Sequence, residues 1–547
     1  MNIHLLYPDK DWLNMTPYFD YLSVVQDLSL HILFRMASRD VVLENGEVKN
    51  ITDTDPFVQD AMKKIMVVPL TSKEEILYRQ EIVKDCINEE DFIRELYVKV
   101  TDILKAWEQL GRRENKRSGK QNTVSGLVTE VHVLKLFVKG LTDIKRHLTM
   151  YMPRLHSTGF NQLLERLNEV FSDEEQEKYE SILKDISFFI DNHKEDANLM
   201  TINSPKIVIE CGVADGLKLS DIKLDTVACE TKRYRDPNSA LGKFNSFLNA
   251  RTPGAIAFQK DTPIYNQVAG IEYEVVKYIM ASCDRLFTTF NGFFDQLRLQ
   301  TAFYVGAVNL THHIERFELE MCYPTVGEQD ELYFEDLKEF VMCIEQRVKA
   351  VGNDVDIKNK MLLIVTGANQ GGKSTFLRSI GVAQIMMQAG LPVTAKRYRT
   401  GIFPAFFTHF TRREDSAMNS GRLDEELGRM NQIIENLGEN SLILLNESFA
   451  TTTEKEGSVI AYDIIKALSE AGVKILTVTH LLSFAQKIYE EAGEAEAKGE
   501  PMPITFLSAE RREDGKRTFK MIQHAPELTS FGLDLYESII NGVKEKR

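Results

Sequence analysis

Apolar residues recur at two different spacings along the chain. Over about the first 350 residues the spacing is helical, as at Ile65 and Ile76, whereas short apolar runs alternate with helical segments over about the last 200. The change falls near Asn353-Asp354-Val355-Asp356. The pattern predicts a mainly helical region over residues 1–340 and, over residues 341–547, an α/β domain whose mostly parallel sheet is flanked by helices.

Three local patterns refine this division. The segment Pro69-Leu70-Thr71-Ser72 interrupts the helical spacing and ends in a capping serine, so we expect two helices that meet at a turn. Residues 199–265 contain short β-rich runs between turn residues, which predicts a β-containing insertion among helices. The runs 503–507 and 517–522 flank Asp514-Gly515, which is a strong hairpin signal.

The composition is that of a soluble globular protein with several cores. The chain has 547 residues, of which 43% are hydrophobic and 27% charged. No run approaches the roughly 18 uninterrupted apolar residues of a membrane span, and the N-terminus does not resemble a signal peptide. We therefore expect a cytoplasmic protein without a membrane partner. The six cysteines lack C-x-x-C spacing, so neither a zinc site nor a disulfide framework is predicted.

The formal net charge of −15 opposes a chain that is covered in nucleic-acid-binding surface. Two local basic clusters nevertheless occur, at residues 112–120 and 232–243. Each can be a DNA contact or a solvated helix end or loop, and the sequence leaves both interpretations open.

A phosphate-binding loop is the strongest chemical signal. Gly367-Ala368-Asn369-Gln370-Gly371-Gly372-Lys373-Ser374-Thr375 fits G-x-x-x-x-G-K-[ST] and follows the apolar strand 361–365. The glycines let backbone N–H groups point at phosphates, which then lie at the N-terminus of the following helix. Lys373 would reach the β- and γ-phosphates, and Ser374 would ligate Mg²⁺. The loop predicts a site for ATP and Mg²⁺.

Two further apolar strands end in polar residues. Residues 441–448 end in Asn446, Glu447 and Ser448, and residues 473–480 end in His480. Parallel sheets place ligands at these carboxyl ends. Asn446 stands where P-loop ATPases usually have an aspartate, so it brings no negative charge to Mg²⁺, while Glu447 keeps a carboxylate that can polarise water. A lone strand-end histidine is more often structural, but its place one strand after Glu447 favours a contact with phosphate or water.

These motifs together resemble the ATPase domain of the MutS family of DNA mismatch-repair and recombination ATPases. The family loop G-P-N-M-G-G-K-S-T differs from this one only at Ala368 and Gln370. Residues 351–355 are similar to the lead-in V-P-N-D-V, and residues 477–480 to the strand end [AT]-T-H. Weaker likenesses, to a core-domain segment at residues 69–83 and to S-[YF]-G-L at residues 530–533, extend the resemblance over roughly residues 20–540. The related ABC and SMC ATPases would need an L-S-G-G-Q segment, which the sequence lacks.

The resemblance implies a role for each matching residue. It implies catalytic roles for Lys373, Glu447 and His480, and Mg²⁺ ligation by Ser374, Asn446 and Glu447. It implies nucleotide contacts by Gly367, Asn369, Gly371, Gly372, Lys373, Ser374 and Thr375. It also implies a homodimer through the ATPase domain, with each site completed by a partner loop to which Ser420 and Gly421 align.

The departures from the family pattern predict slow hydrolysis. Asn446 replaces the strand aspartate, the loop 449–457 differs from G-R-G-T-S-x-x-D-G, and Ala350 occupies the position of an adenine-stacking aromatic. The mismatch-reading wedge and a nuclease-like tail are also expected to be absent, which describes a short MutS-like protein with a helical core and lever region. We expect an ATP-dependent protein that switches a dimeric grip on DNA; the alternative is an ATP-dependent switch that clamps a protein partner.

Overall fold

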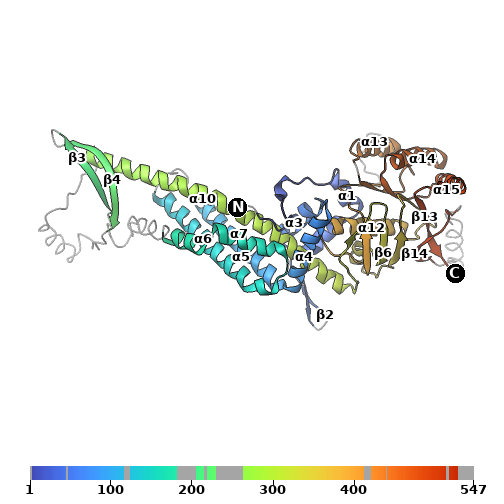
Figure 1. The fold of residues 1–547 in the computed structure, drawn as a ribbon, viewed down its shortest axis with the longest axis horizontal. Coiled ribbons are helices and arrows are strands. Elements are labelled where there is room, and N and C mark those ends of the chain that lie inside the picture. The colour runs from blue at the N-terminus through green and yellow to red at the C-terminus, as the bar shows by residue number, and fades with distance from the viewer. Residues whose placement is uncertain are drawn as a thin grey trace, which may run out of the picture. The chain divides into compact units, whose positions relative to one another are not determined.

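The computed structural model describes residues 3–44, 47–115, 124–181, 205–214, 218–229, 263–411, 421–438, 440–512 and 517–527. The chain forms two compact units, each built from separate stretches of sequence (Figure 1). The first unit comprises Met1–Ile3, Glu95–Pro153 and Gln162–Arg298, and the second comprises His4–Arg94, Arg154–Asn161 and Leu299–Arg547. The boundary at residues 340 and 341 stays a prediction.

The first unit is mainly helical and carries one antiparallel hairpin. Its elements include most of α5 (Glu90–Asn115), α6 (Val124–Tyr151), most of α7 (Thr158–Val170), the start of α10 (Pro263–Arg316), and strands β3 (Pro205–Ala214) and β4 (Lys218–Cys229). The hairpin lies within the predicted insertion, with Ile207 opposite Val227. Phe137 packs against Phe290 and Phe294, with ring centroids 6.2 and 5.2 Å apart. None of the helices in the described ranges is both long and apolar enough to cross a membrane.

A six-stranded sheet forms the centre of the second unit, in the order β10-β11-β12-β8-β13-β14 (Figure 1). Its strands are β8 (Leu362–Thr366), β10 (Ala405–Phe410), β11 (Ser441–Asn446), β12 (Lys474–Val478), β13 (Ile504–Arg511) and β14 (Arg517–Gln523). The first five strands in that order are parallel, and β14 pairs antiparallel with β13. The parallel sheet and the pairing of the two C-terminal strands confirm the predictions, and the turn Asp514-Gly515 lies outside the described residues.

Among the described residues, four helices belong to the sheet region of this unit: α12 (Lys373–Gln388), α13 (Arg422–Glu435), α14 (Glu454–Glu470) and α15 (Leu482–Ala497). Thr453 is the N-cap of helix α14, and its hydroxyl accepts the Glu456 N–H. Its buried residues Ala461 and Ile465 pack into a core with Ile475 of β12. Burial of these apolar faces is what joins the helices to the sheet.

A second sheet of four strands belongs to the same unit. It has the order β5-β9-β6-β7, made of β5 (Thr325–Val326), β6 (Leu332–Leu337), β7 (Asn353–Ile357) and β9 (Arg397–Thr400). The short helix α11 (Phe340–Gln346) lies between β6 and β7 in the chain. Strand β7 alternates buried and exposed residues, as expected of a strand with one buried face.

The N-terminal stretch of the second unit contributes short helices and one hairpin. Its elements are the 3₁₀ turn Trp12–Asn14, α1 (Tyr21–Asp27), α2 (Leu30–Ala37), β1 (Val41–Glu44), β2 (Glu47–Ile51), α3 (Pro56–Met66) and α4 (Lys73–Asn88), while a second 3₁₀ turn, Met152–Arg154, precedes α7. The Ser72 hydroxyl accepts the Glu75 N–H, and the Glu75 carboxylate accepts the Ser72 N–H. This capping box confirms the predicted turn between two helices.

Arg79 of α4 joins this N-terminal stretch to the C-terminal end of α12. It is fully buried, and its guanidinium donates to the Leu6 carbonyl at 2.9 and 3.1 Å and to the Ala389 carbonyl at 3.4 Å. The rings of Tyr7 and Phe303 lie 5.0 and 5.6 Å from its Cζ. Ala389 is the C-cap of α12, where the helix dipole favours a cation. Carbonyls and ring faces therefore solvate this buried charge.

A buried amide reinforces the same junction. Gln388 donates to the carbonyls of Leu70 and Phe403 at 3.2 and 3.0 Å, and its own side-chain oxygen accepts from Phe403 N and from Gln384. The Leu70 N–H in turn donates to the Gln388 carbonyl at 2.9 Å. Both donors of this amide and its acceptor are therefore satisfied, so the end of α12 is fixed by directional bonds as well as by packing.

A charged cluster fixes the last turn of α10. His312 lies 2.8 Å from Asp40 through Nδ1 and 2.8 Å from Glu90 through Nε2, and Arg94 approaches Asp40 to 3.1 Å. The hydrogen bonds to Asp40 and Glu90 raise the pKa of His312 to about 9. The position near a helix C-terminus also favours the protonated ring.

We expect the stability that His312 contributes to depend on pH. Because its pKa is raised above the ordinary value of 6.5, the contribution is complete below pH 6.5 and is lost as the pH rises through about 9. After allowance for solvent screening it should be about 1–2 kcal/mol. Urea midpoints of wild type and His312→Gln at pH 6 and pH 9.5 measure it, and a difference that stays constant between the two pH values would contradict the assignment.

Candidate nucleotide-binding site

The loop between β8 and α12 requires glycine at specific positions. Gly367 and Gly372 have φ angles of 108° and 91°, in the region that side chains disfavour. A Cβ at Gly367 would lie 2.9 Å from the backbone nitrogen of Ala509, and one at Gly371 would lie 2.8 Å from the Ala368 carbonyl oxygen. The loop therefore packs against β13 as bare backbone.

Lys373, the first residue of α12, is held inside this loop. Its Nζ donates to the carbonyls of Gly367 and Ala368 at 2.8 and 3.0 Å, and the residue is 4% exposed. Burial lowers its pKa, while the carboxylates of Glu447 and Glu527 oppose the shift. A buried ammonium at the N-terminus of a helix is a strong attractor for an anion.

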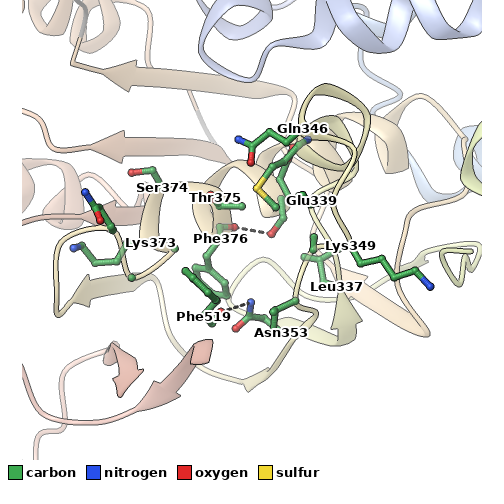
Figure 2. A pocket seen from close by; sticks show the side chains of 18 of the residues that line it. Leu337, Glu339, Gln346, Lys349, Asn353, Lys373, Ser374, Thr375, Phe376 and Phe519 are labelled. Carbon is green, nitrogen blue, oxygen red and sulfur yellow. Dashed lines mark hydrogen bonds between the residues drawn. The ribbon is translucent and has the colours of Figure 1, made fainter. Parts of the chain in front are cut away.

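A cavity of about 580 Å³ opens beside the loop, within the usual size range of ligand pockets (Figure 2). Figure 2 shows Lys373 and Ser374 toward one end of its wall, apart from Gln346, Glu339 and Lys349. Of the predicted residues, Gly371, Gly372, Lys373, Ser374, Thr375 and Glu447 line the cavity. Gly367 and Asn369 belong to the loop but not to this wall.

Glu447 occupies a strained backbone position at the end of β11. Its φ angle is 55°, and that of Phe449 is 65°. Non-glycine residues in this region are uncommon and cluster at functional sites. The Glu447 N–H donates to the Val478 carbonyl at 2.8 Å, and Thr411 donates to the Glu447 carbonyl at 2.7 Å. These bonds turn the chain so that the Glu447 side chain reaches the cavity.

A buried network supports the loop after Glu447. Glu426 of α13 is 4% exposed and accepts the Phe449 N–H at 3.3 Å and the Thr451 hydroxyl at 2.6 Å. His409 contacts the Glu426 carbonyl through Nε2 and the Ser448 hydroxyl through Nδ1, at 3.1 and 2.7 Å. Since a carbonyl only accepts, Nε2 carries a proton, and the Ser448 hydroxyl donates to the His409 carbonyl at 2.8 Å. The loop geometry thus depends on α13 and β10.

The other predicted residues lie at the same sheet edge or outside the described residues. Asn446 ends β11, and His480 follows β12, within electrostatic reach of Glu454; neither lines the cavity. Gly421 is the N-cap of α13. Ser420 lies outside the described residues, as do residues 530–533, all of the basic cluster at 232–243 and most of the one at 112–120. Completion of the site by a partner therefore stays a prediction.

An aromatic side chain that sequence reasoning missed lines the cavity. Phe519 of β14 is 46% exposed and has a φ angle of 61°, and Ala350 and Val351 line the same cavity. Asn353 holds this strand, because its amide donates to the Phe519 carbonyl at 3.3 Å and accepts the Met521 N–H at 2.7 Å (Figure 2). An amide suits this place because it has both a donor and an acceptor. The antiparallel pairing of β14 was predicted, but the position of Phe519 beside the glycine loop was not.

A buried carboxyl group, Glu339, also lines the cavity. It is 2% exposed, and it caps α11 by accepting the Met342 N–H through Oε2. Its Oε1 is buried and has no hydrogen-bond partner among the described residues. Burial raises the pKa of Glu339 to about 7, against the opposing effect of the Met342 N–H. A buried acceptor without a partner costs about 1–3 kcal/mol.

The residues at the loop end fit Mg²⁺ with a nucleotide phosphate. The Asn446 Oδ1 is buried and lacks a hydrogen-bond partner within the described residues, so it can accept from a metal-bound water. Ser374 lies at the start of α12 and lines the cavity, as a hydroxyl ligand of P-loop Mg²⁺ would. A hydroxyl, an amide and the Glu447 carboxylate form an all-oxygen donor set, which is the preference of this ion.

Comparison with known proteins matches two family models to the chain. Residues 363–540 match MutS domain V, and residues 71–202 match the MutS2 N-terminal domain. The chain is similar to an endonuclease MutS2 of Lacticaseibacillus casei, 33% identical over 134 residues that cover 24% of this chain and 17% of the relative. It is also similar to endonuclease MutS2 of Enterococcus faecalis (26% over 203 residues, 36% and 25% covered) and to DNA mismatch repair protein MutS of a Thermotoga strain (34% over 137 residues, 25% and 17% covered). The aligned parts span only 17–25% of these relatives' lengths.

Removal of the Asn353 amide should destabilise the wall that carries Phe519. Asn353→Ala leaves the buried Met521 N–H unpaired, which should lower the free energy of unfolding by about 1–3 kcal/mol in urea titrations. Lys520→Ala is the matched control, because it breaks only the more exposed 2.9 Å ion pair with Asp354 and should cost less than about 1 kcal/mol. Equal losses in the two variants would show that the amide has no special role.

Proposed function

The chain belongs to the MutS family, and we propose that it is an ATPase in which ATP binding and slow hydrolysis switch a dimeric grip on DNA. The observation that carries the proposal is the juxtaposition of Lys373 and Glu447 in the wall of one cavity, at the carboxyl edge of a parallel sheet. A cation for phosphate and a carboxylate for water are the two groups that ATP hydrolysis requires.

Binding would begin with the loop and α12. Backbone N–H groups of the glycine loop and the helix N-terminus bind the phosphates, and Lys373 exchanges the carbonyls of Gly367 and Ala368 for phosphate oxygens. The base lies between Phe519 and the apolar side chains near Val351, where an aromatic ring and a flat apolar surface suit a purine. Phe519 thus takes the stacking role that Ala350 lacks.

Hydrolysis would depend on Glu447. Its carboxylate accepts a proton from the attacking water and orients it toward the γ-phosphate, while the hydrogen bonds from Thr411 and to Val478 hold its backbone in place. Mg²⁺, when bound, neutralises charge on the phosphates. Asn446 offers an uncharged acceptor to its hydration shell where an aspartate would add a negative charge, which is the basis for slow turnover.

Glu447→Gln should abolish most of the ATPase activity and leave ATP binding intact. Loss of a positioned base lowers turnover by roughly 100- to 10,000-fold, measured as phosphate release at saturating ATP and Mg²⁺. Lys373→Ala is the companion variant and should lose binding itself, measured with a fluorescent ATP analogue. Fast hydrolysis that does not depend on Glu447 would refute both the assignment and the slow-switch mechanism.

The DNA component of the proposal rests on the family and on the relatives' names. Two of these relatives are named as an endonuclease and a DNA mismatch repair protein. The hairpin β3–β4 and the helices of the first unit would provide a surface for backbone contacts, with the basic clusters at residues 112–120 and 232–243 as candidates. Paired ATPase domains would close around DNA when both sites hold ATP.

A second function, the clamping of a protein partner, is favoured by the formal net charge of −15. Phosphate neutralisation requires a local excess of Lys and Arg, and a net acidic surface repels DNA at low salt. ATP would then control a protein interface by the same closure of paired sites. The two functions differ in whether nucleotide changes affinity for DNA.

Titration of DNA with and without ATP and Mg²⁺ distinguishes them. At fixed salt, followed by fluorescence anisotropy, we expect the affinity for matched duplex, single-mismatch duplex or branched DNA to change on ATP addition, with a preference for one structure. Lys373→Ala should keep its nucleotide-free affinity and lose the response to ATP. Failure of wild type to bind any of the three at moderate salt would favour the protein-partner switch.

A further inference from the structure

Glu339 is a buried acceptor in the wall of the nucleotide cavity that the ATPase chemistry does not use. It precedes α11, it is 2% exposed, and it lies in the part of the wall that Figure 2 shows apart from Lys373. One carboxyl oxygen, Oε2, accepts the Met342 N–H, and the other, Oε1, has no hydrogen-bond partner in the described part of the chain.

Few groups of a nucleoside triphosphate can satisfy this oxygen. The phosphates carry only acceptors and negative charge, so they would repel a carboxylate. The donors are the ribose hydroxyls and the amino group of the base. The Glu339 carboxylate accepts the backbone N–H of Met342. Met342 lines the cavity together with Val348 and Val351, which form an apolar part of its wall. Because the base is the apolar, planar part of the ligand, this wall places the base next to the carboxyl group.

We propose that Glu339 reads the base of the bound nucleotide, its Oε1 accepting a hydrogen bond from the amino group at purine position 6 and so selecting ATP over triphosphates with a carbonyl group there. The inference rests on the proposed nucleotide binding and names the residue that sets its specificity. A site built to bond a substrate N–H rejects analogues that lack it, because the buried partner is then left unpaired.

The charges around Glu339 are compatible with this role. Arg378 of α12 lies near enough to stabilise the carboxylate, and Glu345 of α11 opposes it. Neither forms an ion pair with Glu339 in the described residues. The backbone N–H groups of Met342 and Val341 therefore hold the carboxyl group, while Oε1 has no hydrogen-bond partner of good geometry in the described part of the chain.

Binding of three nucleotides to wild type and Glu339→Gln tests the proposal. The probes are ATP, purine riboside triphosphate, which lacks the amino group, and inosine triphosphate, which has a carbonyl group at position 6. Wild type should bind ATP roughly tenfold more tightly than either analogue. In Glu339→Gln the side-chain oxygen can still cap Met342 while its NH₂ group faces the base. ATP affinity should then fall by roughly tenfold, purine riboside triphosphate should be unaffected, and inosine triphosphate should gain.

One control variant and one fallback make the result decisive. Glu345→Gln removes the same charge from the exposed face of α11 and should leave the order of affinities unchanged. Should Glu339→Gln fail to fold, the preference of wild type for ATP over purine riboside triphosphate still tests the contact.

Three outcomes would contradict base reading or the function beneath it. Equal affinity of wild type for ATP and purine riboside triphosphate, or an equal loss for all three nucleotides in Glu339→Gln, would overturn base reading. Weaker binding of 2′-deoxy-ATP in wild type but not in Glu339→Gln would move the contact to the ribose and overturn it too. Wild type that binds no triphosphate would instead reject the proposed function itself.

Discussion

Helix α12 begins where the glycine loop packs bare backbone against Ala509 and ends where Arg79 binds the Ala389 carbonyl. Both ends therefore tolerate little displacement. At the first end the backbone packs too closely for any Cβ, and at the second a buried guanidinium is bound by carbonyls and ring faces. Because Lys373 opens this helix, the position of the phosphate site depends on the core around Arg79, about 24 Å away along a 16-residue helix.

The edge of the sheet that carries Glu447 is built differently. Glu447 and Phe449 adopt left-handed backbone conformations without the help of glycine, and the strain is compensated by hydrogen bonds from Thr411 and to Glu426. Such strain persists only where surrounding contacts determine it. Helix α13 therefore fixes the loop after Glu447, although none of its residues lines the cavity. A change of α13 position would alter the direction of the Glu447 side chain before it altered any nucleotide contact.

Much of the ATP-binding half could be predicted from sequence because local pattern and tertiary environment agree there. The buried strands β8, β11 and β12 are mainly apolar, few residues other than glycine fit the tight positions of the loop, and Ser72 with Glu75 specifies a helix start by local bonds alone. Phe519 and Glu339 could not be found in this way, because each lines the cavity only through packing with segments that are far away in the sequence. An exposed phenylalanine on an edge strand and a glutamate before a short helix have no distinctive local pattern. The division into units was equally hidden, since residues 4–94 pack with residues after 299.

That interleaved division has a consequence for how the chain is made. Arg79 and Ala389 are 310 positions apart, and Leu70 and Gln388 are 318 apart, so the early segment meets its partners late in synthesis. At roughly 5–20 residues per second a ribosome needs about 15–60 s to cover that distance. During this interval Leu5 lacks Gln300 and Tyr304, whose side chains bond its backbone in the finished fold. The core around Arg79 is consequently completed only after residue 389 has been made.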